Sequence, residues 1–218
     1  MDTKAFLGIE PTGSHTETTG RWSMVVRPGL VTGGNFLWGG CGLAASVAAI
    51  EELSGRTCIW ATAQYLSYAR TGETMDIDVT LAVVGHQITQ ARAVCHVGSR
   101  EILTANAAVG ERPFEFAHSF VSMPDVPPPS ALVQRAHRGD VTNTIHEKME
   151  ERFVIGRELD DLDGQPNDGR TLMWARIPEV IEGVDTATLA VLGDFVPMGV
   201  GQALGIRGGG NSLDNTLR

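Results

Sequence analysis

The residues best suited to take part in a chemical reaction lie near the carboxyl end of the sequence, where Asp194 precedes a glycine-containing stretch and Ser212 follows it. A carboxylate beside a substrate can act as a general base that takes a proton from water. A hydroxyl group can hold that water in line. Gly199, Val200 and Gly201 fall where a helix is expected to begin, and free N–H groups at a helix start favour negative charge. These three residues are therefore the candidate oxyanion and substrate-binding site.

Each of these residues also has a simpler interpretation. Asp194 could only cap its own helix, because Asp is a favoured N-cap residue, and Ser212 could be an ordinary strand hydroxyl. Asp214 and Asn215 are interpreted as turn or supporting residues rather than catalysts. No His stands in recognisable motif context with a Ser or Cys, which disfavours a nucleophile–His–acid triad.

The stretch from Asn35 to Gly55 is expected to organise the fold. Its apolar residues cover almost the whole circumference of a helix that runs through Leu53, and a helix without a broad polar face must be surrounded by protein. Its many small side chains allow a sheet to pass close by. Asn35 is expected to be a structural cap, and Gly55 to end the helix.

An internal repeat gives this stretch a counterpart. The segments 35–44 and 194–203 match at a constant offset, with a Phe, two glycines and an Ala in register. Repetition of this kind predicts two copies of one structural unit. We predict an N-terminal unit at 1–116, a stiff Pro-rich connector at 117–141 and a C-terminal unit at 142–218.

Segments with the sequence pattern of β-strands flank the two predicted helices. The first 20 residues are interpreted as an irregular lead-in, followed by strands at 22–26, 57–70, 74–84, 88–97 and 101–109 that tight turns join into hairpins. The second unit is expected to hold strands at 153–157 and 172–177, a helix at 186–192 capped by Asp185, and a strand that starts near Ser212. This order predicts an α+β fold with antiparallel sheets. On the repeat model the second unit lacks its last three strands, so we expect the sequence to be a fragment.

Composition narrows the function classes. The chain has 218 residues, a net charge of −9 and a mean hydropathy of −0.02. The negative charge argues against nucleic-acid binding and against docking on an anionic membrane. No apolar run approaches the roughly 20 residues that a membrane span requires, and the N-terminus lacks a secretory signal. Cys41, Cys58 and Cys95 are expected to be reduced core residues of a cytoplasmic protein. The acidic loop 160–169 lacks the ligand series of a calcium loop, so no metal and no cofactor are expected.

The segments FLWGGCGLAASVAAIEEL with QYLSYAR, and LGDFVPMGVGQALG with GGNSLDNTLR, resemble the double-hotdog acyl-CoA thioesterases, above all the acyl-CoA thioesterase II family. The resemblance implies a double hotdog, in which two antiparallel sheets each wrap around a central helix. It places the catalytic Asp at Asp194 and a catalytic Ser or Thr at Ser212. A Gln that completes the family's site would lie beyond Arg218. The resemblance further implies hydrolysis of acyl-CoA and a homo-oligomer formed through the sheets.

Two other functions stay open on sequence grounds. The protein could be an acyl-CoA or acyl-carrier binding module with a decayed site. It could also be a hotdog enoyl-CoA hydratase, although Val196 stands where that motif has Asn and no His occurs from Asp194 to Arg218.

Overall fold

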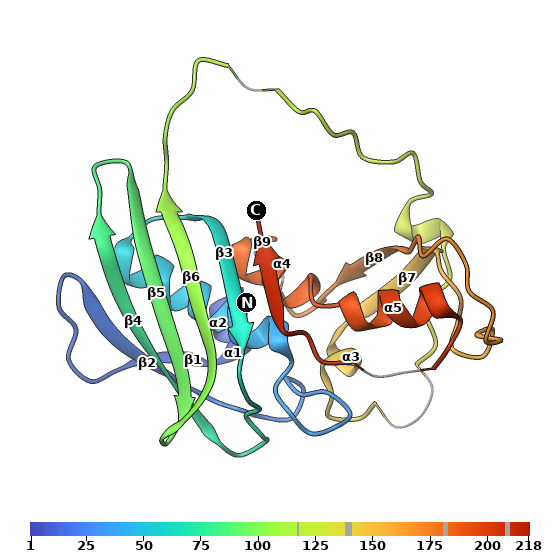
Figure 1. Cartoon of the computed structure of the whole chain (residues 1–218), viewed down its shortest axis with the longest axis horizontal. Coiled ribbons are helices and arrows are strands. Elements are labelled where there is room, and N and C mark those ends of the chain that lie inside the picture. Colours follow the sequence, from blue (N-terminus) through green and yellow to red (C-terminus); the bar gives the residue numbers. More distant parts are fainter. Residues whose placement is uncertain (117, 138–140, 181–182, 208–209) are drawn as a thin grey trace.

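A seven-stranded antiparallel sheet curls around one long helix, α2, in the computed structural model of the protein (Figure 1). The structure describes residues 1–218 except 117, 138–140, 181–182 and 208–209. The strand order in the sheet is β1-β2-β4-β5-β6-β3-β9. Its strands are β1 (Ile9–Thr12), β2 (Thr19–Val25), β3 (Cys58–Tyr65), β4 (Thr74–Val84), β5 (Ile88–Val97), β6 (Arg100–Gly110) and β9 (Asp214–Leu217).

A smaller two-stranded sheet and short helices form the rest of the structure. The strands are β7 (Glu150–Ile155) and β8 (Leu172–Arg176), which pair antiparallel. The helices are α1 (Thr3–Leu7), α2 (Gly39–Ser54), the 3₁₀ helix η1 (Pro129–Ala131), α3 (Ile145–Lys148), α4 (Thr186–Leu192) and α5 (Val196–Leu204). Helix α4 packs on α2, and α5 lies beside the two-stranded sheet (Figure 1).

Helix α2 is buried along most of its length, as its sequence predicts. The inward positions of β4 carry larger apolar side chains such as Ile77 and Leu81, whereas Ala91, Ala93, Ala105 and Ala107 of β5 and β6 are small. Small residues on the central strands allow the helix to approach the sheet. Burial of each large apolar side chain stabilises this packing by about 1.5–3 kcal/mol.

The predicted α+β hotdog architecture is confirmed, and so are the bounds of several elements. Strands β4 and β5 span the predicted residues, and Asp185 caps α4 through a reciprocal capping box with Thr188. The three cysteines are free and buried. Burial raises the pKa of the Cys58 thiol to about 11, as expected of a core residue.

Three local predictions were wrong. Residues 1–20 are not irregular, because they contain α1 and β1. The predicted strand 57–70 ends at Tyr65. Asn35 does not cap the central helix, which begins four residues later at Gly39. Instead, Asn35 has a positive φ of 61° and its side-chain oxygen accepts a hydrogen bond from Thr71.

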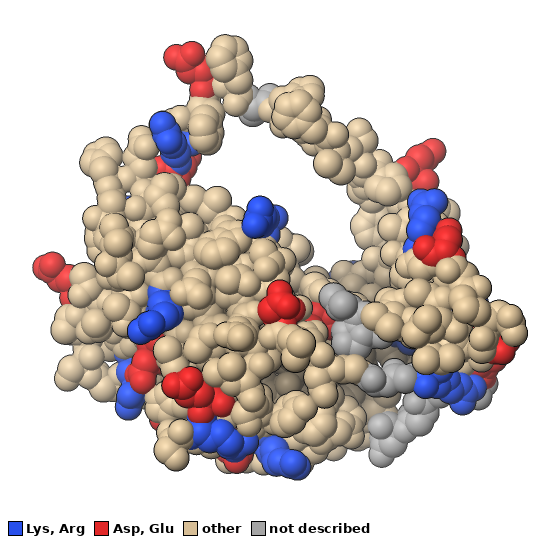
Figure 2. All heavy atoms as spheres, viewed as in Figure 1, with Lys and Arg blue, Asp and Glu red and all other residues tan. Residues whose placement is uncertain are grey.

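The C-terminal strand β9 leaves the smaller part of the structure and pairs with β3, at the edge of the large sheet. Segments that are far apart in sequence therefore share one sheet. A long connector after β6 arches away from the rest of the molecule before it reaches η1, and the space-filling view shows an opening beneath it (Figure 2). The domain bounds 1–116, 117–141 and 142–218 stay a prediction.

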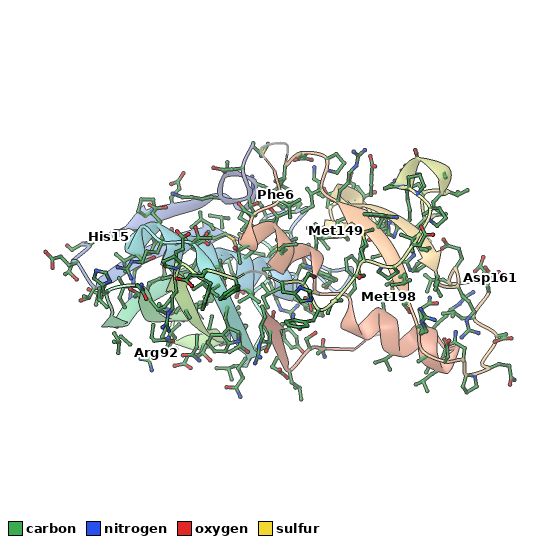
Figure 3. The ribbon with its side chains drawn as sticks, turned by 90° about the horizontal axis from the view of Figure 1, so that it is seen from above. Phe6, His15, Arg92, Met149, Asp161 and Met198 are labelled. Carbon is green, nitrogen blue, oxygen red and sulfur yellow. The ribbon has the colours of Figure 1, made fainter. Side chains whose placement is uncertain are left out.

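The surface bears charges of both signs. On the face shown in Figure 2, Lys and Arg alternate with Asp and Glu, without a continuous basic patch. Figure 3 shows the long axis of the molecule, with His15 and Arg92 on the large-sheet side and Met198 and Asp161 toward the opposite end. Within the described ranges, no helix is both long and apolar enough to cross a membrane.

Candidate active site

Asp194 lies in the short loop between α4 and α5 and is only 5% exposed. Its Oδ2 accepts a hydrogen bond from the N–H of Gly40, at 2.9 Å. Its Oδ1 accepts one from the Ser212 hydroxyl, at 3.1 Å, and one from the Asn215 amide, at 2.8 Å. The structure therefore brings together Asp194 and Ser212, the two residues that the sequence suggested as catalytic.

Asp194 does not cap its own helix. The N-cap of α5 is Phe195, which makes no side-chain capping bond, whereas the Asp194 carboxylate faces the N-terminus of α2. A helix N-terminus carries a partial positive charge, and a buried carboxylate needs such compensation. In the described part of the chain, Asp194 forms no ion pair with Lys or Arg, so N–H and O–H donors alone compensate its charge.

The glycines at the start of α2 make this approach possible. A Cβ on Gly39 would lie 2.7 Å from Oδ2 of Asp194, and a Cβ on Gly40 would lie 2.5 Å from the carbonyl oxygen of Ala190. Both distances are too short for a side chain. The N–H of Gly39 is the first of the helix, and none of the described residues accepts a hydrogen bond from it. Such N–H groups point out of the N-terminal end of a helix.

Tyr65 extends the hydrogen-bond network. The Asn215 amide nitrogen that donates to Asp194 also donates to the Tyr65 hydroxyl oxygen, at 3.1 Å. Burial and the negative charge of Asp194 raise the pKa of Tyr65 well above its ordinary value. The phenol group therefore stays protonated at neutral pH.

Two cavities meet at Asp194. The larger, about 460 Å³, is lined by residues of the α2 start, the end of β3 and the segment before β9, among them Phe36, Tyr65, Tyr68 and Ser212. The smaller, about 230 Å³, is lined by the apolar residues Leu159, Leu162, Phe195, Met198 and Ile206, together with Arg135, His146 and Gln202. Trp38, Asp194 and Gly210 line both. A substrate that extends on both sides of its reacting centre can place one part in each cavity and the reacting centre beside Asp194.

The three residues predicted to form the oxyanion site lie further along α5 than expected. The helix begins at Val196, so the N–H of Gly199 is already bonded to the carbonyl of Phe195, at 3.2 Å. The side chain of Val200 is 55% exposed, and Gly201 lines the smaller cavity. Because the N–H of Gly199 is already bonded within the helix, it cannot serve as the predicted oxyanion donor.

A buried ionic cluster lies beside the smaller cavity. Glu151 is fully buried and accepts hydrogen bonds from Arg135, at 2.7 Å, and from His146, at 3.1 Å. His137 lies 3.8 Å from the same carboxylate. His137, His146 and Glu151 are close enough to one another for a metal ion. However, the Arg135 guanidinium already holds one carboxylate oxygen and would repel a cation, so we assign the cluster a structural role.

Four features of the site region were not predicted from the sequence: Tyr65, Gly39, Gly40 and the ionic cluster. The glycine pair was visible, but nothing local shows that it faces a carboxylate more than 150 residues away in sequence. Asn215 was interpreted as a supporting residue, and it does support Asp194.

These features define a hotdog-fold protein whose polar site lies where the start of the central helix meets residues from the carboxyl end of the chain. No protein-family model and no curated protein sequence matches the chain. Solved structures do. One is a protein from Novosphingobium aromaticivorans with a provisional thioesterase assignment, at 28% identity and a TM-score of 0.80, covering 94% of this chain and 78% of that one.

Two more distant structures show the same fold. A hotdog protein of unknown function from Alicyclobacillus acidocaldarius aligns at 18% identity and a TM-score of 0.80, over 95% of this chain and 74% of that one. An acyl-CoA thioesterase II from Mycobacterium marinum aligns at 16% identity and a TM-score of 0.63, over 92% and 71%. The resemblance to hotdog thioesterases is thus confirmed at the level of fold.

Proposed function

We propose that the protein is a thioesterase that hydrolyses acyl-CoA to a free carboxylic acid and CoA. The observation that carries this proposal is a buried carboxylate, Asp194, at the junction of two cavities and a helix N-terminus. The thioesterase assignments of similar folds support the choice of reaction.

Asp194 serves as the general base in the proposed mechanism. A carboxylate has about four lone-pair positions, and three protein donors occupy three of them. The remaining position accepts a hydrogen bond from a water molecule in one of the cavities. Asp194 takes a proton from this water as its oxygen attacks the thioester carbon. The C–S bond of the tetrahedral intermediate then breaks, and the thiolate leaves and takes the proton from Asp194.

The N-terminus of α2 stabilises the intermediate. Gly39, the first residue of this helix, lines the larger cavity, and the dipole of a 16-residue helix favours negative charge there. Donors aimed at the developing oxyanion are often the largest single contribution to such catalysis. Apolar side chains of the two cavities would surround the acyl chain, at about 0.8 kcal/mol for each buried methylene group.

Release of free thiol from a panel of acyl-CoA thioesters tests this proposal. Asp194→Asn keeps the size of the side chain but cannot accept the proton, so we expect kcat to fall by about 10²- to 10⁴-fold. Asp214→Asn is the matched control, because Asp214 is exposed and does not contact Asp194. Equal turnover by wild type and Asp194→Asn would remove Asp194 from the mechanism.

Ser212→Ala tests the hydrogen bond that the Ser212 hydroxyl donates to the proposed base, Asp194. It removes one hydrogen bond to a charged acceptor, which contributes about 1.5 kcal/mol or more. We therefore expect kcat to fall about tenfold, less than in Asp194→Asn.

A wild-type protein that binds acyl-CoA without turnover would favour the binding-module alternative instead. Assembly into homo-oligomers and a cytoplasmic location stay predictions, which size measurements and localisation would test.

A further inference from the structure

We propose that the Tyr65 hydroxyl donates a hydrogen bond to the carbonyl oxygen of the bound thioester and, with the N–H of Gly39, forms the oxyanion site. This inference rests on the proposed thioester hydrolysis. It assigns a direct catalytic contact to a residue that the sequence did not single out.

The position of Tyr65 supports this role. It is the last residue of β3, and its N–H is held by the carbonyl of Leu213, at 2.9 Å, just before β9 begins. Its ring lines the larger cavity. A Cβ on Gly39 would lie 3.1 Å from Cζ of Tyr65 and 2.7 Å from Oδ2 of Asp194. The phenol, the carboxylate and the first turn of α2 therefore meet around one α-carbon.

The hydrogen-bond inventory leaves the Tyr65 hydrogen free. A carboxylate only accepts hydrogen bonds, so the Asn215 group that faces Asp194 must be its NH₂. The same nitrogen lies 3.1 Å from the Tyr65 oxygen. Asn215 therefore donates both of its amide hydrogens, one to Asp194 and one to Tyr65, and the Tyr65 oxygen accepts the second. Among the described residues, no acceptor is found for the hydrogen of the Tyr65 hydroxyl.

The environment of Tyr65 also favours a role as a hydrogen-bond donor over a role as a general base. Burial and the nearby carboxylate raise the pKa of the Tyr65 phenol, so its O–H is available as a donor at neutral pH. A neutral donor held by Asn215 needs little reorganisation when negative charge appears on the substrate. Fixed donors of this kind lower the barrier most when they face the oxyanion.

In the proposed step, water attacks the thioester carbon and gives its proton to Asp194. The carbonyl π electrons move to the oxygen, which accepts hydrogen bonds from Tyr65 and Gly39. Collapse of the intermediate restores the carbonyl group and breaks the C–S bond. The leaving sulfur keeps the electron pair of that bond and takes the proton held by Asp194. Tyr65 keeps its proton throughout.

Tyr65→Phe removes only the hydroxyl, and Thr216→Val provides the control for loss of a hydroxyl group. Thr216 lies on β9 and lines neither cavity, and its hydroxyl lies 3.0 Å from that of Thr62. For Tyr65→Phe we expect kcat to fall by about 10²- to 10³-fold with little change in KM. Thr216→Val should stay within about threefold of wild type, since it removes no donor from the oxyanion site.

A second measurement separates catalysis from structure. A thioether analogue of acyl-CoA lacks the carbonyl oxygen, so its Kd should be the same for wild type and Tyr65→Phe. A trifluoromethyl ketone analogue presents an oxyanion-like oxygen, and its binding should weaken in step with kcat. Thermal unfolding of both variants checks that the fold is intact.

Three results would overturn the proposal. One is a Tyr65→Phe enzyme that retains kcat within threefold of wild type. Another is equal loss of affinity for the ketone and the thioether, which indicates a packing role. If wild type itself releases no thiol, the thioesterase function fails and this proposal fails with it, whereas an active wild type with an active Tyr65→Phe overturns the Tyr65 role alone.

Discussion

Gly40 connects the base of the proposed reaction to the central helix. Its N–H donates to Asp194, and its α-carbon lies so close to the end of α4 that no side chain fits. The same residue thus allows the packing of α4 on α2 and orients the carboxylate. Activity and stability should therefore be coupled at this position.

We predict that Gly40→Ala lowers the free energy of unfolding by about 1–3 kcal/mol, since the new methyl group would meet backbone oxygens at 2.5 and 2.9 Å. Its kcat should fall as well, because the N–H moves away from Asp194. Gly199→Ala is the control: it makes the same exchange inside a helix where no atom lies within 4 Å, so it should stabilise the protein by about 0.5–1 kcal/mol. Denaturant unfolding measures both, and similar losses in the two variants would contradict the steric argument.

At the scale of elements, local sequence patterns account for the large sheet and its helix. Alternating apolar residues in 74–84 and 88–97 predicted β4 and β5, because successive side chains of a strand point to opposite faces of the sheet and only one face is buried. The pairing of β9 with β3 and the contact of Asp194 with α2 depend on residues more than 150 positions apart, and no local pattern encodes them. Residues 199–201 were expected to supply free N–H groups at a helix start, but α5 begins at Val196, so they lie about one turn inside it. The sequence suggested Asp194 and Ser212 as the candidate pair, whereas the hydrogen bond from the N–H of Gly40 to Asp194 was not predicted.

The ionic cluster that joins β7, α3 and the end of the connector should control acid stability. Burial raises the pKa of Glu151, but hydrogen bonds from His146 and Arg135 outweigh it, so the pKa lies below the ordinary value of 4.5. Burial lowers the pKa of His137 below 6.5. Both groups bind protons more readily in the unfolded chain, so folding stability falls as the pH drops. The loss should begin below about pH 6.5 through His137 and continue through the folded pKa of Glu151.

Glu151→Gln tests this cluster. It leaves the buried Arg135 charge with only the exposed Glu158 as a partner, so we expect a loss of about 3–5 kcal/mol at pH 7. Stability should also depend less on pH below about 4.5, where protonation of Glu151 no longer contributes. Glu158→Gln is the control, because Glu158 also faces Arg135 but is 42% exposed, at 3.7 Å. An exposed pair contributes about 0–1 kcal/mol. Parallel pH profiles for wild type and Glu151→Gln would show that Glu151 does not set the acid limit.

At the scale of the whole molecule, the two ends of the chain are joined by packing rather than by the connector. Strand β9 pairs with β3, α4 packs on α2, and the Trp38 indole donates to the carbonyl of Val191. The connector after β6 instead carries exposed aromatic residues, with Phe116 87% and Phe120 91% exposed. It contacts the smaller sheet again from Pro127, whose carbonyl accepts a hydrogen bond from Trp174.

This arrangement predicts that the connector can be cut without loss of the site. Brief chymotrypsin treatment should cleave after Phe114, Phe116 or Phe120, because exposed chain without secondary structure is the preferred site of proteolysis. The two fragments should stay together in gel filtration, since β3–β9 pairing and α2–α4 packing cross the cut. Thiol release should remain within about twofold of the uncut protein, because Asp194, Gly40 and Tyr65 keep their contacts. Separation of the fragments, or loss of activity upon cleavage, would show that the connector itself holds the two ends in place.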